Sequence, residues 1–412
     1  MQIESRRFTL FLAGIAALTS LSIDMSLPTT PAIEHEFHLA AGQGSLIMSL
    51  FLAGYALTPL IGGPLADRLG RRSVLLVSLI LFALSALLCG LAANFAMLLV
   101  FRLLQGCASG VATTMPLAIV RDLLAGSTAR KRMSEVTAIN SGMPILAPII
   151  GSMVVQVESW RVLFGIQAVF ASAIILALLL DFSETLPAEH RHPLHVTDLF
   201  RSYRQLLGNR IFISYALINA LGFACIFSFI SVSPLILMQR MGVVHAIYPV
   251  MFAAISAGTI LGSFASVILN HRETPVRAII TLGLVIMVVG SVSAAACQIA
   301  GYHRPAALLP AVFATLFGFG LIAPSVTLEA LAPAPTLAGA GSGALRSILM
   351  IFGAGTSASL ATYCARHASH VEVATTLTMS CMAFLALAVY VCMLLPLVPS
   401  GAHSNDLERM LP

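Results

Sequence analysis

Long apolar runs, repeated from one end of the chain to the other, are the feature that most constrains its fold. A membrane helix needs about 20 mostly apolar residues to cross ~30 Å of hydrocarbon, and about twelve such runs follow one another in two sets of six. The first set lies near 8–27, 44–65, 73–93, 97–120, 133–155 and 161–181. The second lies near 211–233, 247–269, 276–297, 305–325, 340–363 and 374–397. The sequence therefore predicts an all-α membrane protein of twelve transmembrane helices in two six-helix bundles.

The small share of charged residues excludes a soluble protein. Only 9% of the 412 residues are charged and 58% are hydrophobic. A soluble domain has roughly 25% charged residues, because water must solvate its surface. The net charge of +5 has the sign that nucleic acids attract. The basic residues lie between the apolar runs, however, so we interpret them as orienting the chain in a lipid bilayer and expect no nucleic-acid partner.

The distribution of basic residues between loops predicts the orientation of the chain. Of 22 Lys and Arg residues, Arg102 lies within an apolar run, and all but four of the others fall on one side. The four on the opposite side are Arg161, Arg240, Arg304 and Arg366. Because cytoplasmic loops hold the excess of Lys and Arg, both termini and the middle loop are predicted to be cytoplasmic. The chain is therefore expected to cross a membrane many times.

The two sets of runs predict a chain of four parts. The only long polar stretch separates the sets and is too short to form a soluble domain. The parts are an N-terminal six-helix bundle at 1–181, a cytoplasmic linker loop at 182–210, a C-terminal six-helix bundle at 211–397 and a cytoplasmic tail at 398–412.

No removable leader, metal site or cofactor site is expected. The first apolar run follows Arg6 and Arg7, but no small-residue cleavage site ends it, so we interpret it as a retained span. The linker histidines, His190, His192 and His195, lack the spacing of metal ligands. The seven cysteines are scattered, which indicates neither a disulfide framework nor a metal site.

The loop between the second and third runs has the sequence GPLADRLGRR at residues 63–72. It resembles the signature loop of the major facilitator superfamily, G-x-L-A-D-R-x-G-R-R, at every fixed position. Gly63 would let two helices approach closely, and Gly70 would turn the chain where a side chain would clash. Asp67 can pair with a cationic loop residue or cap a helix N-terminus. We therefore expect a conformational latch, the alternative being arginines that only hold topology. The latch residues are Gly63, Asp67, Arg68, Gly70, Arg71 and Arg72.

The fourth run contains a charged residue, Arg102, in a pattern with Leu98, Gln105 and Gly106. The pattern is similar to L-x-x-x-R-x-x-Q-G of the same superfamily. An arginine within a span costs at least about 2.5 kcal/mol, so it should face the bundle interior and find an acceptor. The expected acidic partner is Asp24; the alternative is a structural role in which Arg102 bonds backbone carbonyls.

The first run ends in SIDMSLPTTP, residues 22–31. This stretch resembles S-x-D-M-Y-L-P-x-x-P of the bicyclomycin/chloramphenicol resistance (Bcr/CflA) group of drug:proton antiporters, with Ser26 where tyrosine is usual. The resemblance covers nearly the whole chain and is strongest in its first half. Burial favours the neutral form of a carboxyl group, and a nearby cation favours its charged form. A conformational change that alters either one can therefore load or release a proton. Asp24 is expected to be the proton carrier; the alternative is a cap of the turn before Pro28.

The fifth run contains PILAPIIGS at residues 144–152. It looks like the antiporter motif of superfamily exporters in its A-P-x-x-G form, although Ala147 and Ser152 stand where the broader motif has glycines. Pro144 and Pro148 are expected to kink the span, and Gly151 to permit a close crossing. The motif favours export, although prolines also kink spans of importers.

Other charged and aromatic residues have lesser expected roles. Asp122 follows Arg121 in a pair similar to one in the drug-resistance group, so it is expected either to assist proton exit or to pair with Arg121. Glu329 is a second candidate for proton exit, and Arg346 has no assigned partner. Trp160, the only tryptophan, is expected to be an anchor at the membrane interface.

The resemblance implies a substrate site near the middle of the membrane, between the two halves. Polar groups are scarce at mid-span, so apolar surface and shape are expected to select several substrates rather than one hydrophilic metabolite. The candidate lining residues are Phe51, Tyr55, Gln105, Phe223, Phe227 and Phe252.

The leading hypothesis is a monomeric proton-coupled antiporter that exports small, largely apolar drugs. Protons would load Asp24 from the periplasm and weaken its attraction to Arg102, so that the substrate leaves outward. The alternative is a transporter of one endogenous metabolite, including an importer that uses proton symport. A membrane enzyme is not expected, because the chain has no H-E-x-x-H, G-x-S-x-G or Walker motif. Substrate identity and proton stoichiometry are not encoded in any of these motifs.

Overall fold

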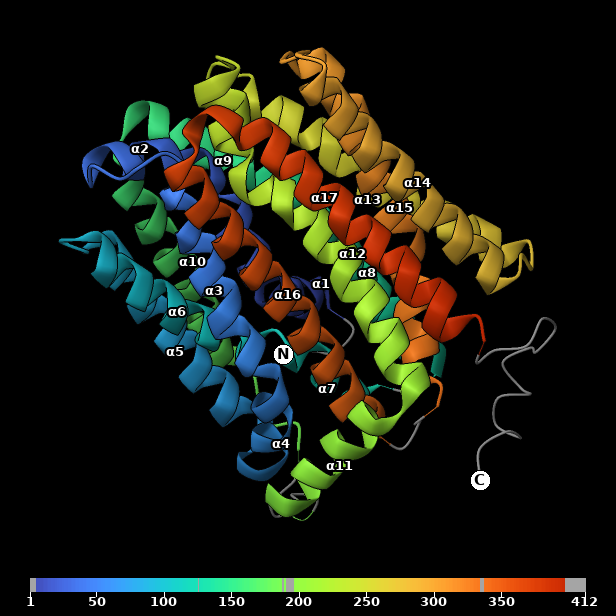
Figure 1. The fold of residues 1–412 in the computed structure, drawn as a ribbon. Helices are drawn as coiled ribbons and strands as arrows, with labels where there is room; N and C mark the ends of the chain where they lie inside the picture. Colours follow the sequence, from blue (N-terminus) through green and yellow to red (C-terminus); the bar gives the residue numbers. More distant parts are fainter. Residues whose placement is uncertain (1–4, 125, 187–188, 190–195, 334–336, 397–412) are drawn as a thin grey trace. The chain divides into compact units, whose positions relative to one another are not determined.

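The computed structural model describes residues 5–124, 126–186, 189, 196–333 and 337–396 (Figure 1). Throughout these residues the regular structure is helical, and the described part of the chain contains no strand. The linker histidines His190, His192 and His195 and the expected tail at 398–412 lie outside the described residues.

The prediction of twelve transmembrane helices is confirmed. Among the described residues, eleven helices are long and apolar enough to cross a membrane, and a bent pair supplies the twelfth span. The pair joins Gln43–Leu57 to Pro59–Leu69 at 45°. Pro59 has no backbone N–H to donate, so the helix breaks there and restarts with proline in its first turn.

The structure divides into two compact units, and the first comprises residues 1–195 and 243–250. In this unit α5, α6 and α10 lie side by side (Figure 1). Its elements are α1 (Arg6–Asp24), η1 (Leu27–Thr29), α2 (Thr30–Glu36), η2 (Gln43–Ser45), α3 (Leu46–Leu57), α4 (Pro59–Leu69), α5 (Arg71–Gly90), α6 (Phe95–Ala112), α7 (Met115–Leu123), α8 (Gly126–Ser141), α9 (Met143–Val157) and α10 (Trp160–Asp181).

The second unit comprises residues 196–242 and 251–412. In it α12 packs along α16 and α17, and α14 packs along α15 (Figure 1). Its elements are α11 (Val196–Gly208), α12 (Arg210–Pro234), η4 (Leu235–Arg240), α13 (Tyr248–His271, whose first turn is assigned to the first unit), α14 (Val276–Ile299), α15 (Pro305–Leu331), α16 (Ala338–Arg366), η6 (Ala368–His370), α17 (Val371–Val389) and η7 (Tyr390–Leu394).

Helix α11 lies within the segment 182–210 that the sequence analysis treats as a loop. Leu206 is buried and Leu199 and Tyr203 are half-buried, whereas Arg201 and Arg204 are exposed. The buried positions recur every three or four residues, which is the period of a helix with one apolar face. Part of the segment is therefore an amphipathic helix, which a search for span-length apolar runs cannot detect.

Glycines allow two helices of the first unit to cross closely. A Cβ built on Gly54 of α3 would lie 2.1 Å from the carbonyl oxygen of Leu103, and one on Gly106 of α6 would lie 2.0 Å from that of Phe51. Larger residues at these positions would force α3 and α6 apart. The contact fixes α6 against α3, which positions the arginine of α6 described next.

Candidate functional site

Arg102 of α6 is the centre of a buried polar network in the first unit. Its side chain is fully buried. The guanidinium donates to the carbonyl oxygens of Ser22, at 3.1 Å, and Ile47, at 3.2 Å. It also donates at 2.9 Å to Gln105, which donates at 2.8 Å to Gln167. One cation thus joins α1, α3 and α6 directly, and α10 through Gln105.

Asp24, the last residue of α1, is a buried acid. Its exposed fraction is 9%, and among the described residues no hydrogen bond or ion pair involves its carboxyl group. A cap of the turn before Pro28 would require that group to accept a backbone N–H, and no such bond is formed among those residues. An acidic side chain within a span is costly and rare, and by default marks a functional site.

The expected ion pair between Arg102 and Asp24 is not formed among the described residues, and that prediction is wrong. Arg102 meets α1 at the carbonyl of Ser22, two residues before Asp24. Two residues of an α-helix are about 200° apart around its axis, so Asp24 lies on another face of α1. The structure has the alternative that the sequence left open, in which Arg102 bonds backbone carbonyls.

The second part of the fifth span packs against the end of α1. Pro144 lies in the first turn of α9, just after the break from α8, and only Pro148 is in the helix interior. A Cβ built on Gly151 would lie 2.2 Å from the carbonyl oxygen of Met25. The backbone of α9 therefore touches the residue that follows Asp24, and any movement of α9 must involve that part of α1.

Arg71 links the signature loop to α7. Its Nη2 lies 2.6 Å from Oδ1 of Asp67, and its Nε lies 3.0 Å from Oδ2 of Asp122. The exposed fraction of the side chain is 6% for Arg71, 14% for Asp122 and 46% for Asp67. Of the two pairings expected for Asp67, the structure has the one with a cation. Asp122 pairs with Arg71 rather than with its neighbour Arg121, so the local pair considered above is wrong.

Glu184 completes this cluster and was not singled out from the sequence. Its carboxylate accepts the backbone N–H groups of Arg71, at 2.8 Å, and Arg72, at 3.2 Å. These groups open α5, where the helix dipole favours an anion. The next residue, Thr185, donates at 3.3 Å to Asp122. Glu184 lies 113 positions after Arg71, so no local pattern could have identified it.

The two glycines of the signature loop differ in role. Gly70 has φ 93° and ψ 148°, a backbone conformation that favours glycine. Gly63 has no atom within 4 Å of a built Cβ, so the close helix approach expected there is wrong. The neighbouring Gly62 provides it instead, because its Cβ would lie 3.3 Å from Cα of Val111 in α6. A shift of one residue turns a helix by about 100°, which explains the difference.

The other two arginines of the loop are less enclosed. Arg68 is exposed. Arg72 is half-buried, and its Nη2 donates to the carbonyl oxygen of Leu179, near the end of α10, at 3.3 Å. Arg71 is therefore the loop arginine that joins two carboxylates, and Arg72 is the one that reaches the sixth span.

Three of the candidate lining residues are packed inside the first unit. The ring centroid of Phe51 lies 4.8 Å from the guanidinium carbon of Arg102, and Phe51 is fully buried. Gln105 is also fully buried, between Arg102 and Gln167. Tyr55 has an exposed fraction of 1%, and its hydroxyl is 2.8 Å from Thr113 Oγ1. In this conformation Phe51 and Gln105 support Arg102 and are not available to a substrate.

The other three candidates belong to the second unit. Phe223 and Phe227 of α12 stack with ring centroids 5.3 Å apart, and Phe223 also contacts Phe319 of α15 at 6.4 Å. Phe227 and Phe252 are buried, and Phe223 is half-buried. Of these side chains Phe223 is the most accessible, so it is the strongest remaining candidate for substrate contact.

Trp160 is not the interfacial anchor that the sequence predicts. Its exposed fraction is 3%, and its indole N–H donates to Glu36 at 2.5 Å. Arg161 lies 2.9 Å from the same carboxylate, and its guanidinium carbon lies 4.3 Å from the indole centroid. The carboxylate of Glu36 in α2 thus binds both Trp160 and Arg161 at the start of α10. Both contacts are charge-assisted, which makes them stronger than hydrogen bonds between neutral groups.

The second unit has an ion pair that the sequence analysis also missed. Arg240 of η4 lies 3.1 Å from Glu372 of α17, whose side chain is 7% exposed. Glu329 is partly exposed near the end of α15, and Arg346 is exposed on α16. Neither position gives these two residues a defined role.

Comparison with known proteins identifies the family. The family model described as Major Facilitator Superfamily matches residues 12–357. The MFS-type transporter YdgK of Bacillus subtilis is 29% identical over 352 residues, which cover 83% of this chain and 86% of that protein. The multidrug resistance protein MdtL of Escherichia fergusonii is 30% identical over 260 residues, covering 63% of this chain and 66% of MdtL.

A solved structure has the same fold. The crystal structure of a D-xylose-proton symporter matches with a TM-score of 0.72, covering 94% of this chain and 98% of that one. The sequences are only 13% identical, so the likeness concerns the fold alone.

Proposed function

This chain belongs to the Major Facilitator Superfamily and is a multi-pass membrane transporter, and on that premise we propose that it is a proton-coupled exporter of small, largely apolar drugs. The proposal places it in the Bcr/CflA group of antiporters, in a bacterial inner membrane with both termini cytoplasmic. It would act as a monomer, with protons and a small-molecule substrate as its partners.

The observation that supports proton coupling is the buried carboxyl group of Asp24. A charge in hydrocarbon is far more costly than the neutral acid, so a carboxyl group with no cation beside it can exchange a proton when its access to water changes. The group lies at the end of the first span, and the following residue touches Gly151 of α9. Loading and unloading of a proton can therefore be transmitted to the fifth span.

The observation that supports drug export is the similarity to MdtL, whose name describes multidrug resistance. The A-P-x-x-G stretch of the fifth span, with Pro148 in the helix interior and Gly151 at the crossing, agrees with it. The aromatic stack of the half-buried Phe223 on the buried Phe227 provides apolar surface in the second unit.

The proposed mechanism differs from the one expected from the sequence. Arg102 is not the cation that Asp24 releases, because it holds carbonyl groups of α1 and α3. We assign Arg102 to keeping these helices together while the end of α1 and α9 change their contact. The cluster of Asp67, Arg71 and Asp122 would hold the ends of α4, α5 and α7 in one of the two conformations of alternating access.

The first experiment is a resistance panel in a bacterial strain that lacks its main drug exporters. Expression of this chain is expected to raise tolerance to several chemically unrelated apolar compounds. The control is the same chain with Asp24→Asn, which should give no increase at equal membrane abundance. No increase for the native chain would favour transport of an endogenous metabolite.

The second experiment uses everted membrane vesicles, whose interior corresponds to the outside of the cell. A compound from the panel should accumulate when respiration acidifies the vesicle interior, and a protonophore should abolish the accumulation. Accumulation that persists with the protonophore would contradict proton coupling. Accumulation only in right-side-out vesicles would contradict export and favour a symporter.

A further inference from the structure

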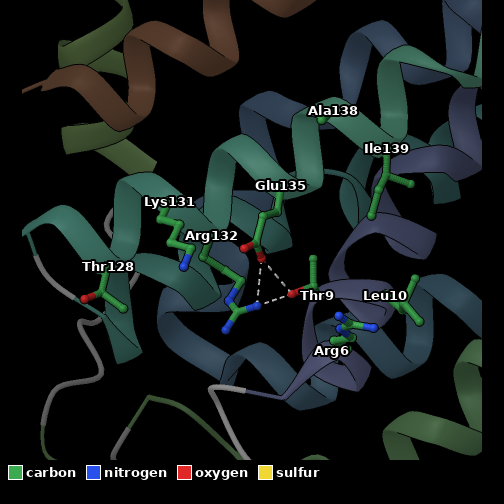
Figure 2. Close-up of a pocket in the computed structure, with 9 residues that line it drawn as sticks. All are labelled: Arg6, Thr9, Leu10, Thr128, Lys131, Arg132, Glu135, Ala138 and Ile139. Carbon is green, nitrogen blue, oxygen red and sulfur yellow. Dashed lines mark hydrogen bonds and ion pairs between the residues drawn. The ribbon is translucent and has the colours of Figure 1, made fainter.

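A cavity of about 950 Å³ lies between α1 and α8 in the first unit (Figure 2). Its volume is within the range of about 300–1,000 Å³ that ligand sites occupy. None of the groups discussed above for proton coupling or for the latch borders it. The lining residues are Arg6, Thr9, Leu10, Thr128, Lys131, Arg132, Glu135, Ala138 and Ile139.

The polar part of the cavity has an excess of positive charge. Arg132 pairs with Glu135 at 2.8 Å, and Thr9 bonds to both side chains. The cations of Arg6 and Lys131 are not part of this pair, and both residues are exposed. Figure 2 shows Arg6, Lys131 and Arg132 arranged around the Thr9–Glu135 contact. The cavity therefore has two positive charges more than its single carboxylate offsets, which suits an anion.

The other part of the cavity is apolar and lies further along both spans. Leu10, one turn after Arg6, has an exposed fraction of 61%. Lys131 is the first residue of its span, and Ile139 lies eight residues further along, about 12 Å at 1.5 Å per residue. In Figure 2 Leu10 and Ile139 border the cavity on the side away from Thr128. Charged groups at the membrane border and apolar groups deeper inside match the two ends of a lipid.

We propose that this cavity binds one anionic phospholipid, whose phosphate contacts Arg6 and Lys131 while an acyl chain lies along Leu10 and Ile139. Basic pockets between transmembrane helices are a recurrent way of holding such headgroups. The lipid would contact both the start of α1 and α8, on the N-terminal side of the break between α8 and α9. It would thereby stabilise the contact of the first and fifth spans at the end opposite Asp24. The apolar border selects a lipid over free phosphate.

The test is a lipid titration of the purified full-length protein in a zwitterionic detergent, followed by its thermal unfolding midpoint. The ligands are phosphatidylglycerol, phosphatidylcholine with the same chains, and inorganic phosphate. Phosphatidylglycerol should raise the midpoint, and the other two should not. Each basic side chain near an anionic headgroup contributes about fivefold in affinity, so Arg6→Gln with Lys131→Gln should raise the half-saturating concentration about 25-fold.

The matched control removes two positive charges outside the cavity, by Arg272→Gln with Arg304→Gln. Both residues are exposed, and neither lines the cavity. This variant should change the half-saturating concentration less than about twofold, because neither side chain lines the cavity that would hold the headgroup. Equal weakening in both double variants would overturn the site, since general charge would then explain binding.

A third variant should increase the affinity for phosphatidylglycerol, and it tests the site even if the first double variant fails to fold. Glu135→Gln removes the single carboxylate of the cavity and should tighten binding of phosphatidylglycerol about fivefold. Unchanged or weaker binding by this variant would overturn the proposal. Equal stabilisation by phosphatidylcholine would overturn the charge selection, and full stabilisation by inorganic phosphate would overturn the lipid. None of these readouts involves transport, so they are independent of the proposed function.

Discussion

Gly151 of α9 lies against the backbone carbonyl of Met25, where an added Cβ would approach that oxygen to 2.2 Å. The neighbouring Pro28 would be 2.9 Å from the same Cβ. Neither obstacle is a flexible side chain, so the crossing of the first and fifth spans depends on the absence of a side chain at position 151. The contact is adjacent to Asp24, and substitution of Gly151 can test whether the two spans must cross this closely.

The first prediction concerns this crossing. Gly151→Ala should destabilise the protein by about 1–3 kcal/mol, because the added methyl group must displace backbone. The thermal unfolding midpoint in detergent measures the effect. Gly165→Ala in α10 is the control, since no atom lies within 4 Å of a Cβ built there. A loss for Gly165→Ala as large as that for Gly151→Ala would contradict the crossing.

The second prediction concerns Arg71. Arg71→Gln should cost about 3 kcal/mol, because it leaves the largely buried Asp122 without its cation. Arg71→Lys should recover only part of the loss, since an ammonium cannot reach two carboxylates as a guanidinium does. Arg72→Gln is the neighbouring control and should cost less than 1 kcal/mol. Chemical denaturation in mixed micelles can rank the three variants, and equal losses would argue against the cluster.

The third prediction concerns the coupling of Asp24 to Arg102. Because no hydrogen bond or ion pair joins the two side chains among the described residues, we expect their effects on stability to add to within about 0.5 kcal/mol. Asp24→Asn, Arg102→Gln and the double variant form the cycle, read from unfolding midpoints. A coupling well above that figure would restore the ion pair that the sequence suggested.

The fourth prediction concerns proton coupling. Asp24→Asn should abolish proton-driven accumulation in vesicles while the protein still binds substrate, because an amide side chain does not take up and release a proton as a carboxyl group does. Glu158→Gln, at an exposed acid after α9, should keep accumulation at the native level. Full activity of Asp24→Asn would remove the assignment of Asp24, and another acid would then have to bind the proton.

The fifth prediction uses Trp160 as the only tryptophan of the chain. Its indole is 3% exposed and bonded to Glu36, so brominated lipids and aqueous iodide should both quench its fluorescence weakly. Glu36→Leu removes the acceptor and should change the emission and increase quenching. Strong quenching of the native protein by brominated lipid would instead support an anchor at the membrane interface.

The sequence was sufficient for the fold because each span is a local property. Length and apolar character identify all twelve spans, even where Pro59 divides one of them. The left-handed turn at Gly70 is also local, since the residue type itself permits the conformation.

The partners in the candidate site were less predictable because they depend on how helices are rotated. Whether Arg102 contacts Asp24 or the carbonyl of Ser22 depends on which face of α1 packs on α6. Positions two residues apart in a helix lie on different faces. The same applies to Gly62 and Gly63. Glu184 and Glu36 find their partners far along the chain, and nothing in their neighbouring residues specifies those contacts.

The position of Glu184 has a consequence for how the protein can be divided. The carboxylate that caps α5 follows the sixth span, and its neighbours Thr185 and Leu186 also donate to it or to Asp122. A cut between residues 187 and 195 would leave every charge of this cluster in one fragment. A cut before Ser183 would instead place α5 and the carboxylate that caps it in different fragments.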